Sequence, residues 1–178
     1  IDVAQRGSIG PLGMKAKNPY AGYGYIQKGD QIALGGAYSV QRFTEKPDSE
    51  TAAQFVATGE YFWNSGIFVF RADVMIAELK KYAPAVVDAC MAALAKGARD
   101  SDLVRLDRGA FEKAQNVSVD FAVMERTAKA AVIPCEMGWS DVGSWDAVWA
   151  LEPHDANGNA INGDVFLQDT SGSLVHSD

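Results

Sequence analysis

The sequence predicts an α/β domain in which strands and helices alternate along the chain. Apolar residues recur at helical spacing in some segments, as after Pro84, and alternate with other residues in others, as around Val40. Glycine and proline separate these segments, which is typical of turns between regular elements. The chain has 178 residues, of which 48% are hydrophobic, so it can bury one globular core.

Runs of apolar residues bounded by turn residues predict the strands. They lie within residues 7–26, around residues 38–44, and at 59–70 and 130–135. The stretch 59–70, GEYFWNSGIFVF, is unusual because a polar and flexible centre interrupts an otherwise buried strand.

Cap and stop residues predict the helices. These cover residues 49–58, 73–82 and 84–96, a segment that begins at Ser118, and a segment within WSDVGSWDAVWAL at 139–151. Asp120 lies in the first turn of the Ser118 helix, where a negative charge is favourable. Residues 98–116 are polar, and we expect a loop and a short helix there.

The sequence changes character near Asn157, where short apolar runs alternate with glycine, asparagine, aspartate and serine. This pattern is typical of β-turn coils. We therefore expect two parts, residues 1–155 and residues 156–178.

Charge and composition exclude several classes of function. The net charge is −7, which argues against a general nucleic-acid binder. No apolar run approaches the roughly 20 residues that a membrane span needs, and no secretory signal is present, so we expect a cytoplasmic protein. We expect Cys90 and Cys135 to be reduced and no zinc site at His154 or His176.

Four short motifs carry residues suited to binding chemistry. Within Trp63-Asn64-Ser65-Gly66, the amide offers a donor and an acceptor, and the glycine admits a close ligand; a self-satisfied bulge is the alternative. Glu45-Lys46-Pro47 offers a carboxylate for hydroxyls and an ammonium for phosphate, or forms a solvated turn. GYGYI, at 22–26, exposes backbone to a sugar edge or forms an aromatic hairpin.

The fourth motif is Trp139-Ser140-Asp141-Val142-Gly143, which precedes a helix. A single carboxylate such as Asp141 can bind Mg²⁺, because Mg²⁺ needs only one or two protein carboxylates beside phosphate oxygens. The alternative is that Asp141 is only the N-cap of the helix.

Taken together and in this order, the motifs resemble the mannose-1-phosphate guanylyltransferase family. The matching segments run from about Gly13 to Asp169 and comprise GYGYI, FTEKPD, GEYFWNSGIFVFRAD, SVDFAVMERT, WSDVGSW and the GN…GDV region. The resemblance is closest to the bacterial form that is related to the bifunctional phosphomannose isomerase/guanylyltransferase.

The resemblance implies the C-terminal half of a Rossmann-like (GT-A-like) nucleotidyltransferase domain with a mixed sheet, followed by the start of a β-helix-like extension. It implies formation of GDP-mannose and pyrophosphate from GTP and mannose 1-phosphate with Mg²⁺. It assigns the substrate to Gly24, Tyr25, Glu45, Lys46, Asn64, Ser65 and Gly66. Lys46 would hold the sugar phosphate, Asp141 would bind the metal, and both are the expected catalytic residues.

Two departures from the family pattern limit this assignment. Tyr20 stands where the family usually has an acidic residue, and nothing in residues 1–18 resembles the family's glycine-rich basic loop that wraps the triphosphate. We therefore expect the chain to carry the sugar side of the site and to be inactive alone. We also expect a sheet with an exposed edge, which favours a homo-oligomer or association with the missing N-terminal half.

Two other functions stay open at this point. One is a non-catalytic module that binds a sugar phosphate or pairs with a full-length subunit. The other is a nucleotidyltransferase for a different sugar 1-phosphate.

Overall fold

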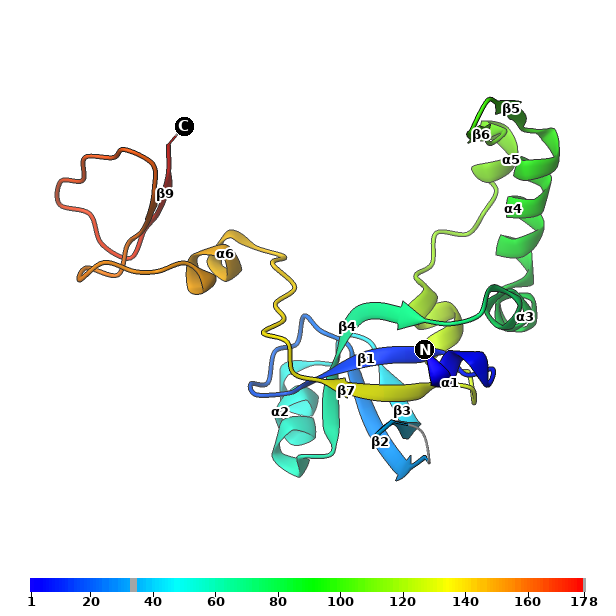
Figure 1. Cartoon of the computed structure of the whole chain (residues 1–178), viewed down its shortest axis with the longest axis horizontal. Helices are drawn as coiled ribbons and strands as arrows, with labels where there is room; N and C mark the ends of the chain where they lie inside the picture. The colour runs from blue at the N-terminus through cyan, green and yellow to red at the C-terminus, as the bar shows by residue number, and fades with distance from the viewer. Residues whose placement is uncertain (33–34, 178) are drawn as a thin grey trace. The chain divides into compact units, whose positions relative to one another are not determined.

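The protein, seen in a computed structural model that describes residues 1–32 and 35–177, forms two compact units (Figure 1). The first comprises residues 1–137 and the second residues 138–178. Within the described residues, no helix is long and apolar enough to cross a membrane.

The first unit is built on five strands that close into a barrel in the order β1-β4-β2-β3-β7. All neighbours are antiparallel except β1 and β7, which are parallel. The strands are β1 (Gly10–Lys15), β2 (Tyr25–Gln31), β3 (Tyr38–Thr44), β4 (Tyr61–Val69) and β7 (Ala131–Cys135). This mixed sheet confirms the α/β class. The expected free sheet edge is wrong, because β3 and β7 pair and close the barrel.

Helix α2 (Ser49–Thr58) packs beside β4 and follows its predicted start and stop. The Asp48 carboxylate caps it by accepting from the Thr51 N–H at 2.7 Å, and Gly59 ends it with φ of 70°. Phe55 of this helix stacks on Tyr61 of β4 at a centroid distance of 4.0 Å. Both belong to a small aromatic core around the fully buried Tyr25.

A second group of elements covers the barrel with helix α3 (Ala72–Tyr82) and the short helix η1 (Asp120–Met124). The predicted helix after Ser118 is confirmed in place but not in type, because η1 is a π-turn. Its defining hydrogen bond runs from the Glu125 N–H to the Asp120 carbonyl at 3.0 Å. The main core lies between these helices and the barrel and contains Ile9, Ile26, Phe43, Met75, Ala122, Val123, Met124, Ala130 and Val132.

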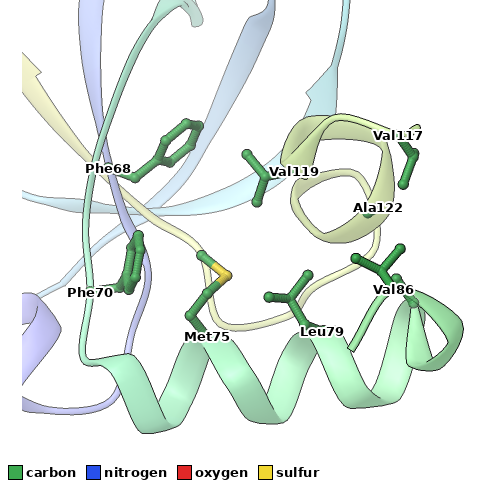
Figure 2. Close-up of a pocket in the computed structure, with 9 residues that line it drawn as sticks. Phe68, Phe70, Met75, Leu79, Val86, Val117, Val119 and Ala122 are labelled. Atoms are coloured by element: carbon green, nitrogen blue, oxygen red, sulfur yellow. The ribbon is translucent and has the colours of Figure 1, made fainter. Parts of the chain in front are cut away.

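An apolar cavity of about 290 Å³ lies where α3, η1 and the start of α4 (Pro84–Lys96) meet the end of β4 (Figure 2). Its walls are aromatic and aliphatic, with no charged side chain among the residues that line it. They are Phe68, Phe70, Met75, Leu79, Ala83, Val86, Val117, Val119 and Ala122.

Several smaller elements complete the first unit. They are α1 (Asp2–Gln5), the hairpin β5 (Ala98–Asp100) and β6 (Leu103–Arg105), and α5 (Arg108–Phe111). The sequence did not predict the hairpin, because its six residues are all exposed and give no alternating pattern. In α4 the buried residues are Ala89 and Ala93, while Met91 and Leu94 of the predicted apolar stripe are about half exposed.

The second unit contains α6 (Trp145–Leu151) and the parallel pair β8 (Ala160–Asn162) and β9 (Leu174–His176). The buried Asn159 holds the intervening loop, because its amide donates to Asp155 and to the Thr170 carbonyl and accepts from the Ser173 N–H. The described residues of this unit show one parallel pair and no β-helix.

Glu78 of α3 is a buried carboxylate that joins α3 to the segment after η1. The Thr127 hydroxyl donates to it at 2.7 Å, and the Lys129 ammonium lies 3.0 Å away. Burial by itself raises the pKa of Glu78, but these two hydrogen bonds and the Lys129 charge outweigh it and hold the pKa below the ordinary 4.5.

We therefore predict that Glu78→Gln destabilises the protein by about 1–3 kcal/mol at neutral pH. A carboxyl with a lowered pKa stabilises the fold above pH 4.5, and this contribution disappears as pH falls through the lowered value. Urea unfolding of the wild type and the variant should show a gap that shrinks below pH 4.5. The exposed Glu136→Gln should show no gap, and a pH-independent gap for Glu78→Gln would contradict the assignment.

Candidate active site

The first unit brings Gly24, Glu45 and Asn64 together, although they come from the start of β2, the end of β3 and the middle of β4. The Asn64 N–H donates to the Gly24 carbonyl at 2.8 Å. A Cβ atom at Gly24 would lie 2.5 Å from Glu45 Oε2 and 3.2 Å from the Cβ of Asn64. The carboxylate and the amide therefore both lie directly against the backbone of Gly24, and only glycine leaves room for them.

A wide bulge in β4 explains why polar residues interrupt this strand. Gly13 pairs with Asn64 and Pro11 with Phe68, so that residues 65–67 face Leu12 alone. The Ser65 hydroxyl donates to the Leu12 carbonyl at 2.8 Å and accepts from the Ile67 N–H at 3.2 Å. Serine thus supplies the hydrogen bonds that the strand ladder loses at the bulge, and its predicted contact with substrate stays a prediction.

Gly66 completes the bulge by adopting a φ of 73°, a conformation that other residues rarely take. Its N–H donates to Asn64 Oδ1 at 3.1 Å. This contact turns the Asn64 amide so that its nitrogen points the other way, toward η1.

Two acidic residues of the η1 region join the site, and the sequence analysis did not assign them to it. The Asn64 amide nitrogen donates to Asp120 Oδ1 at 3.1 Å, and the Glu45 N–H donates to Glu125 Oε1 at 3.0 Å. Asp120 was expected only as a favourable charge at a helix N-terminus. The available signal was the motif SVDFAVMERT, which contains both residues and belongs to the family pattern.

Lys46 places one exposed ammonium beside the half-buried carboxylate of Glu45. The Lys46 Nζ lies 3.7 Å from Glu45 Oε1, and the exposed fractions of the two side chains are 64% and 11%. Lys46 has a φ of 46° and precedes Pro47, so its backbone holds a strained left-handed conformation. Strain of this kind persists where the surrounding structure enforces it, and it marks Lys46 as a candidate functional residue.

Two of the three carboxylates of the site, those of Glu45 and Asp120, are harder to ionise than ordinary ones. Burial raises the pKa of Glu45, the nearby Asp120 and Glu125 charges raise it further, and Lys46 opposes them. Burial also raises the pKa of Asp120, against hydrogen bonds from Asn64 and Ser118. A ligand that donates hydroxyl hydrogens to these oxygens would favour the ionised forms, so the arrangement suits a polyol.

Aromatic rings from the segment before β2 pack against β4. Tyr20 packs against Tyr23 at a centroid distance of 4.5 Å, and Tyr23 meets Trp63 edge-on at 5.3 Å. Tyr25 differs, because its ring is fully buried and its hydroxyl donates to the Tyr20 carbonyl at 3.1 Å. Of Tyr25, only the backbone is placed to serve the predicted substrate contact.

Asp141 belongs to the second unit and is exposed in the loop before α6. The N-cap interpretation of Asp141 is wrong, because Ser144 caps α6 by accepting from the Ala147 N–H at 3.2 Å. Its carboxylate instead folds over Gly143, where an added Cβ would lie 2.7 Å from Oδ2. Nowhere in the described chain do three or more metal-binding acidic, histidine or cysteine side chains gather.

The fold is a closed mixed barrel flanked by helices, and its polar cluster comes from the start of β2, the end of β3 and the middle of β4. The profile of the nucleotidyl transferase family matches residues 2–158, and the chain belongs to this family.

Within that family, the chain is homologous to mannose-1-phosphate guanylyltransferases over part of their length. It is 45% identical to the "Mannose-1-phosphate guanylyltransferase" of Escherichia coli K12 and 44% identical to the "Alginate biosynthesis protein AlgA" of Pseudomonas aeruginosa. Each match covers 98% of this chain and 37% of the relative, so the chain spans little more than a third of their length.

Solved structures give the same picture for the fold. A structure described as "mannose-1-phosphate geranyltransferase" from Thermus thermophilus superimposes with a TM-score of 0.81 at 27% identity. It covers 99% of this chain, which in turn covers 50% of that structure.

We predict that Gly24→Ala destabilises the protein by about 1–3 kcal/mol, because the new methyl group must displace Glu45 or Asn64. The matched control is Gly109→Ala in α5, where the nearest atom to an added Cβ is 3.8 Å away. Thermal unfolding of the two variants decides the point. Equal melting temperatures for Gly24→Ala and the wild type would show that the cluster does not press on Gly24.

Proposed function

We propose that this chain carries the sugar-phosphate side of a mannose-1-phosphate guanylyltransferase site. The observation that carries the proposal is the cluster itself, in which the Glu45 and Asp120 carboxylates and the Asn64 amide lie beside the Lys46 ammonium. Homology to guanylyltransferases over 98% of the chain supports mannose and GTP as the substrates. Glucose or another sugar 1-phosphate is the alternative that the binding experiment below tests.

In this proposal, Glu45 and Asn64 bind sugar hydroxyls and the Gly24 backbone lies along the sugar. Tyr25 contributes its backbone, and Ser65 and Gly66 hold the bulge that presents Asn64. Lys46 binds the phosphate as a compact positive charge at an exposed position. The sugar is thus held at the buried end of the cluster and its phosphate at the solvent end.

The proposed reaction joins two anions. A phosphate oxygen of mannose 1-phosphate forms a bond to the α-phosphorus of GTP, and the bond from that phosphorus to the bridging oxygen of pyrophosphate breaks. Lys46 reduces the repulsion by neutralising charge on the attacking phosphate, and the hydroxyl contacts align it. No residue of this chain needs to form a covalent intermediate.

Asp141 is the residue proposed to hold Mg²⁺. One exposed carboxylate fits this role, because Mg²⁺ in such sites takes most of its oxygens from phosphates and water. When bound, the ion would supply additional charge neutralisation on the phosphates.

Three further proposals concern the C-terminal extension, the cellular location and the pairing partner. We place the start of a β-rich extension after residue 155, close to the end of the family match at residue 158. The lack of a spanning helix among the described residues and the relatives' biosynthetic names are compatible with a cytoplasmic location. Pairing with the N-terminal half of the domain would supply the nucleotide side, and a second copy of this chain is the other proposed partner.

We predict that Lys46→Ala weakens the binding of mannose 1-phosphate at least tenfold and leaves the weak binding of free mannose unchanged. The difference is expected because only the phosphate ester carries the charge that Lys46 contacts. Isothermal titration of the purified 178-residue chain measures both ligands, with Lys113→Ala as an exposed control. Wild-type affinity in Lys46→Ala contradicts the phosphate assignment, and tighter binding of glucose 1-phosphate than of mannose 1-phosphate favours the alternative sugar.

We further predict that the chain alone releases no pyrophosphate from GTP and mannose 1-phosphate. Residues 1–18 offer no glycine-rich basic loop, so the triphosphate lacks a cradle of backbone amides. Release should begin when the N-terminal half of a relative's nucleotidyltransferase domain is added, and Asp141→Asn should then lower it and change its Mg²⁺ dependence.

Three outcomes separate the functions. Robust release from the chain alone overturns the view that the nucleotide site lies elsewhere. Unchanged Mg²⁺ dependence in Asp141→Asn removes the metal role of Asp141. Binding of mannose 1-phosphate without release in any mixture identifies a non-catalytic module.

A further inference from the structure

The short helix η1 holds both sugar-side residues through its two acidic side chains. Asp120 is its first residue and accepts from the Asn64 side chain at 3.1 Å. Glu125 follows its last residue and accepts from the Glu45 backbone N–H at 3.0 Å. One helical turn therefore spans from β4 to the end of β3, the two places from which the sugar-binding groups come.

The spacing of these two acids requires the π-turn. In an α-helix of 3.6 residues per turn, residues five apart point about 140° away from each other around the axis. In a π-turn, the hydrogen bond joins residues five apart and brings the second back over the first. This bond is present between the Glu125 N–H and the Asp120 carbonyl, so both acids face the same side.

The opposite side of η1 is anchored in the core. Val123 and Met124 are buried among the main core residues, and Val119 and Ala122 line the apolar cavity above α3 (Figure 2). Figure 2 shows Val119 on the side of the η1 turn that faces Phe68, with Leu79 below it. Apolar packing on one side thus fixes the position from which the acids reach the site.

Helix α3 also holds the chain that leaves η1. The Tyr82 hydroxyl donates to the Arg126 carbonyl at 3.0 Å, and the Arg126 guanidinium donates to the Tyr82 carbonyl at 3.3 Å. One residue further, Thr127 donates to the buried Glu78. The turn is therefore fixed at its end as well as along its apolar side.

We propose that the π-turn η1 sets the separation and orientation of Glu45 and Asn64, with Asp120 and Glu125 as positioning residues of the sugar-phosphate site. Asp120 fixes which way the Asn64 amide faces, because it accepts from the Asn64 amide nitrogen while the Asn64 oxygen accepts from the Gly66 N–H. Glu125 fixes the backbone from which the Glu45 and Lys46 side chains project. The inference rests on the proposed function for its consequences but not for its geometry.

The geometry can be tested without any ligand. Glu125→Ala should remove the hydrogen-exchange protection of the Glu45 amide in the 178-residue chain, because its acceptor is lost. Glu125→Gln should keep the protection, because an amide oxygen still accepts. Asp88→Ala, an exposed acid in α4, is the control and should leave the Glu45 amide unchanged. Unchanged protection in Glu125→Ala would overturn the proposal.

The consequence for binding is tested by titrating the same variants with mannose 1-phosphate. We expect affinity to fall about tenfold in Glu125→Ala and in Asp120→Ala, as for the loss of one positioning hydrogen bond, and to recover in Glu125→Gln. If the Ala variants unfold at the same urea concentration as the wild type but bind mannose 1-phosphate more weakly, the two acids position the site rather than stabilise the fold. Wild-type affinity in both Ala variants would overturn the proposal.

The charge of Asp120 provides a second readout. Glu45 faces Asp120, Lys46 and Glu125, and burial together with the two acids raises its pKa. Asp120→Asn removes one of the like charges, so the pH below which binding weakens should move to a lower value. If binding weakens at the same pH in Asp120→Asn as in the wild type, the proposed charge interaction between Asp120 and Glu45 is contradicted.

Deleting Phe121, which is 47% exposed, should convert the π-turn into an α-turn in which Asp120 and Glu125 are four residues apart and still share a face. The Glu45 amide should therefore keep its protection, and a loss of protection in a folded variant would contradict the assignment. If the deletion unfolds the chain, the comparison of Glu125→Ala with Glu125→Gln still tests the proposal. If the wild-type chain binds no mannose 1-phosphate, the proposed function fails, while the exchange experiment still tests the role of η1.

Discussion

The Ser65 hydroxyl, which donates to the Leu12 carbonyl of the adjacent strand β1, holds β4 in a bulge on which the rest of the site depends. Beyond this contact, Gly66 turns with a positive φ and donates its N–H to the Asn64 oxygen. The bulge therefore determines where the Asn64 nitrogen points. Without it, the strict alternation of a strand would place residues 64 and 66 on the same side of the sheet, with their backbone groups in the ladder.

The site is assembled by contacts between segments that are far apart in sequence. Asn64 and Asp120 are 56 residues apart, and Glu45 and Glu125 are 80 apart. Closure of the barrel through the β3–β7 pair brings the end of β3 and the segment before β7 near each other. The position of η1 then follows from its packing on α3 and the core. Close packing of η1 on α3 and the core therefore fixes the positions of the polar groups in the site.

Sequence reasoning succeeds where the structure is determined locally and fails where it is not. The start and stop of α2 were predictable, because Asp48 and Gly59 act within one turn of the helix. The role of Ser65 was open, since a bulge and a ligand contact require the same residue types. The π-turn and the contacts of Asp120 and Glu125 could not be predicted from periodicity, because distant partners select them. The family motif pointed to the segment but not to its geometry.

The charges of the site are arranged in an order that suits its proposed ligand. The protein carries a net charge of −7, and the buried end of the site adds Glu45 and Asp120, which would repel a phosphate. Lys46 lies at the exposed end, with its Nζ 3.7 Å from Glu45 Oε1. A sugar phosphate placed with its hydroxyls toward Glu45 and Asp120 donates hydrogen bonds to these carboxylates, whose pKa values are raised. Its phosphate then lies next to the Lys46 ammonium. In the reverse orientation the phosphate would face the half-buried carboxylates of Glu45 and Asp120, and this contact between like charges is unfavourable. The charges that raise the pKa values of Glu45 and Asp120 would therefore favour one orientation of the proposed ligand.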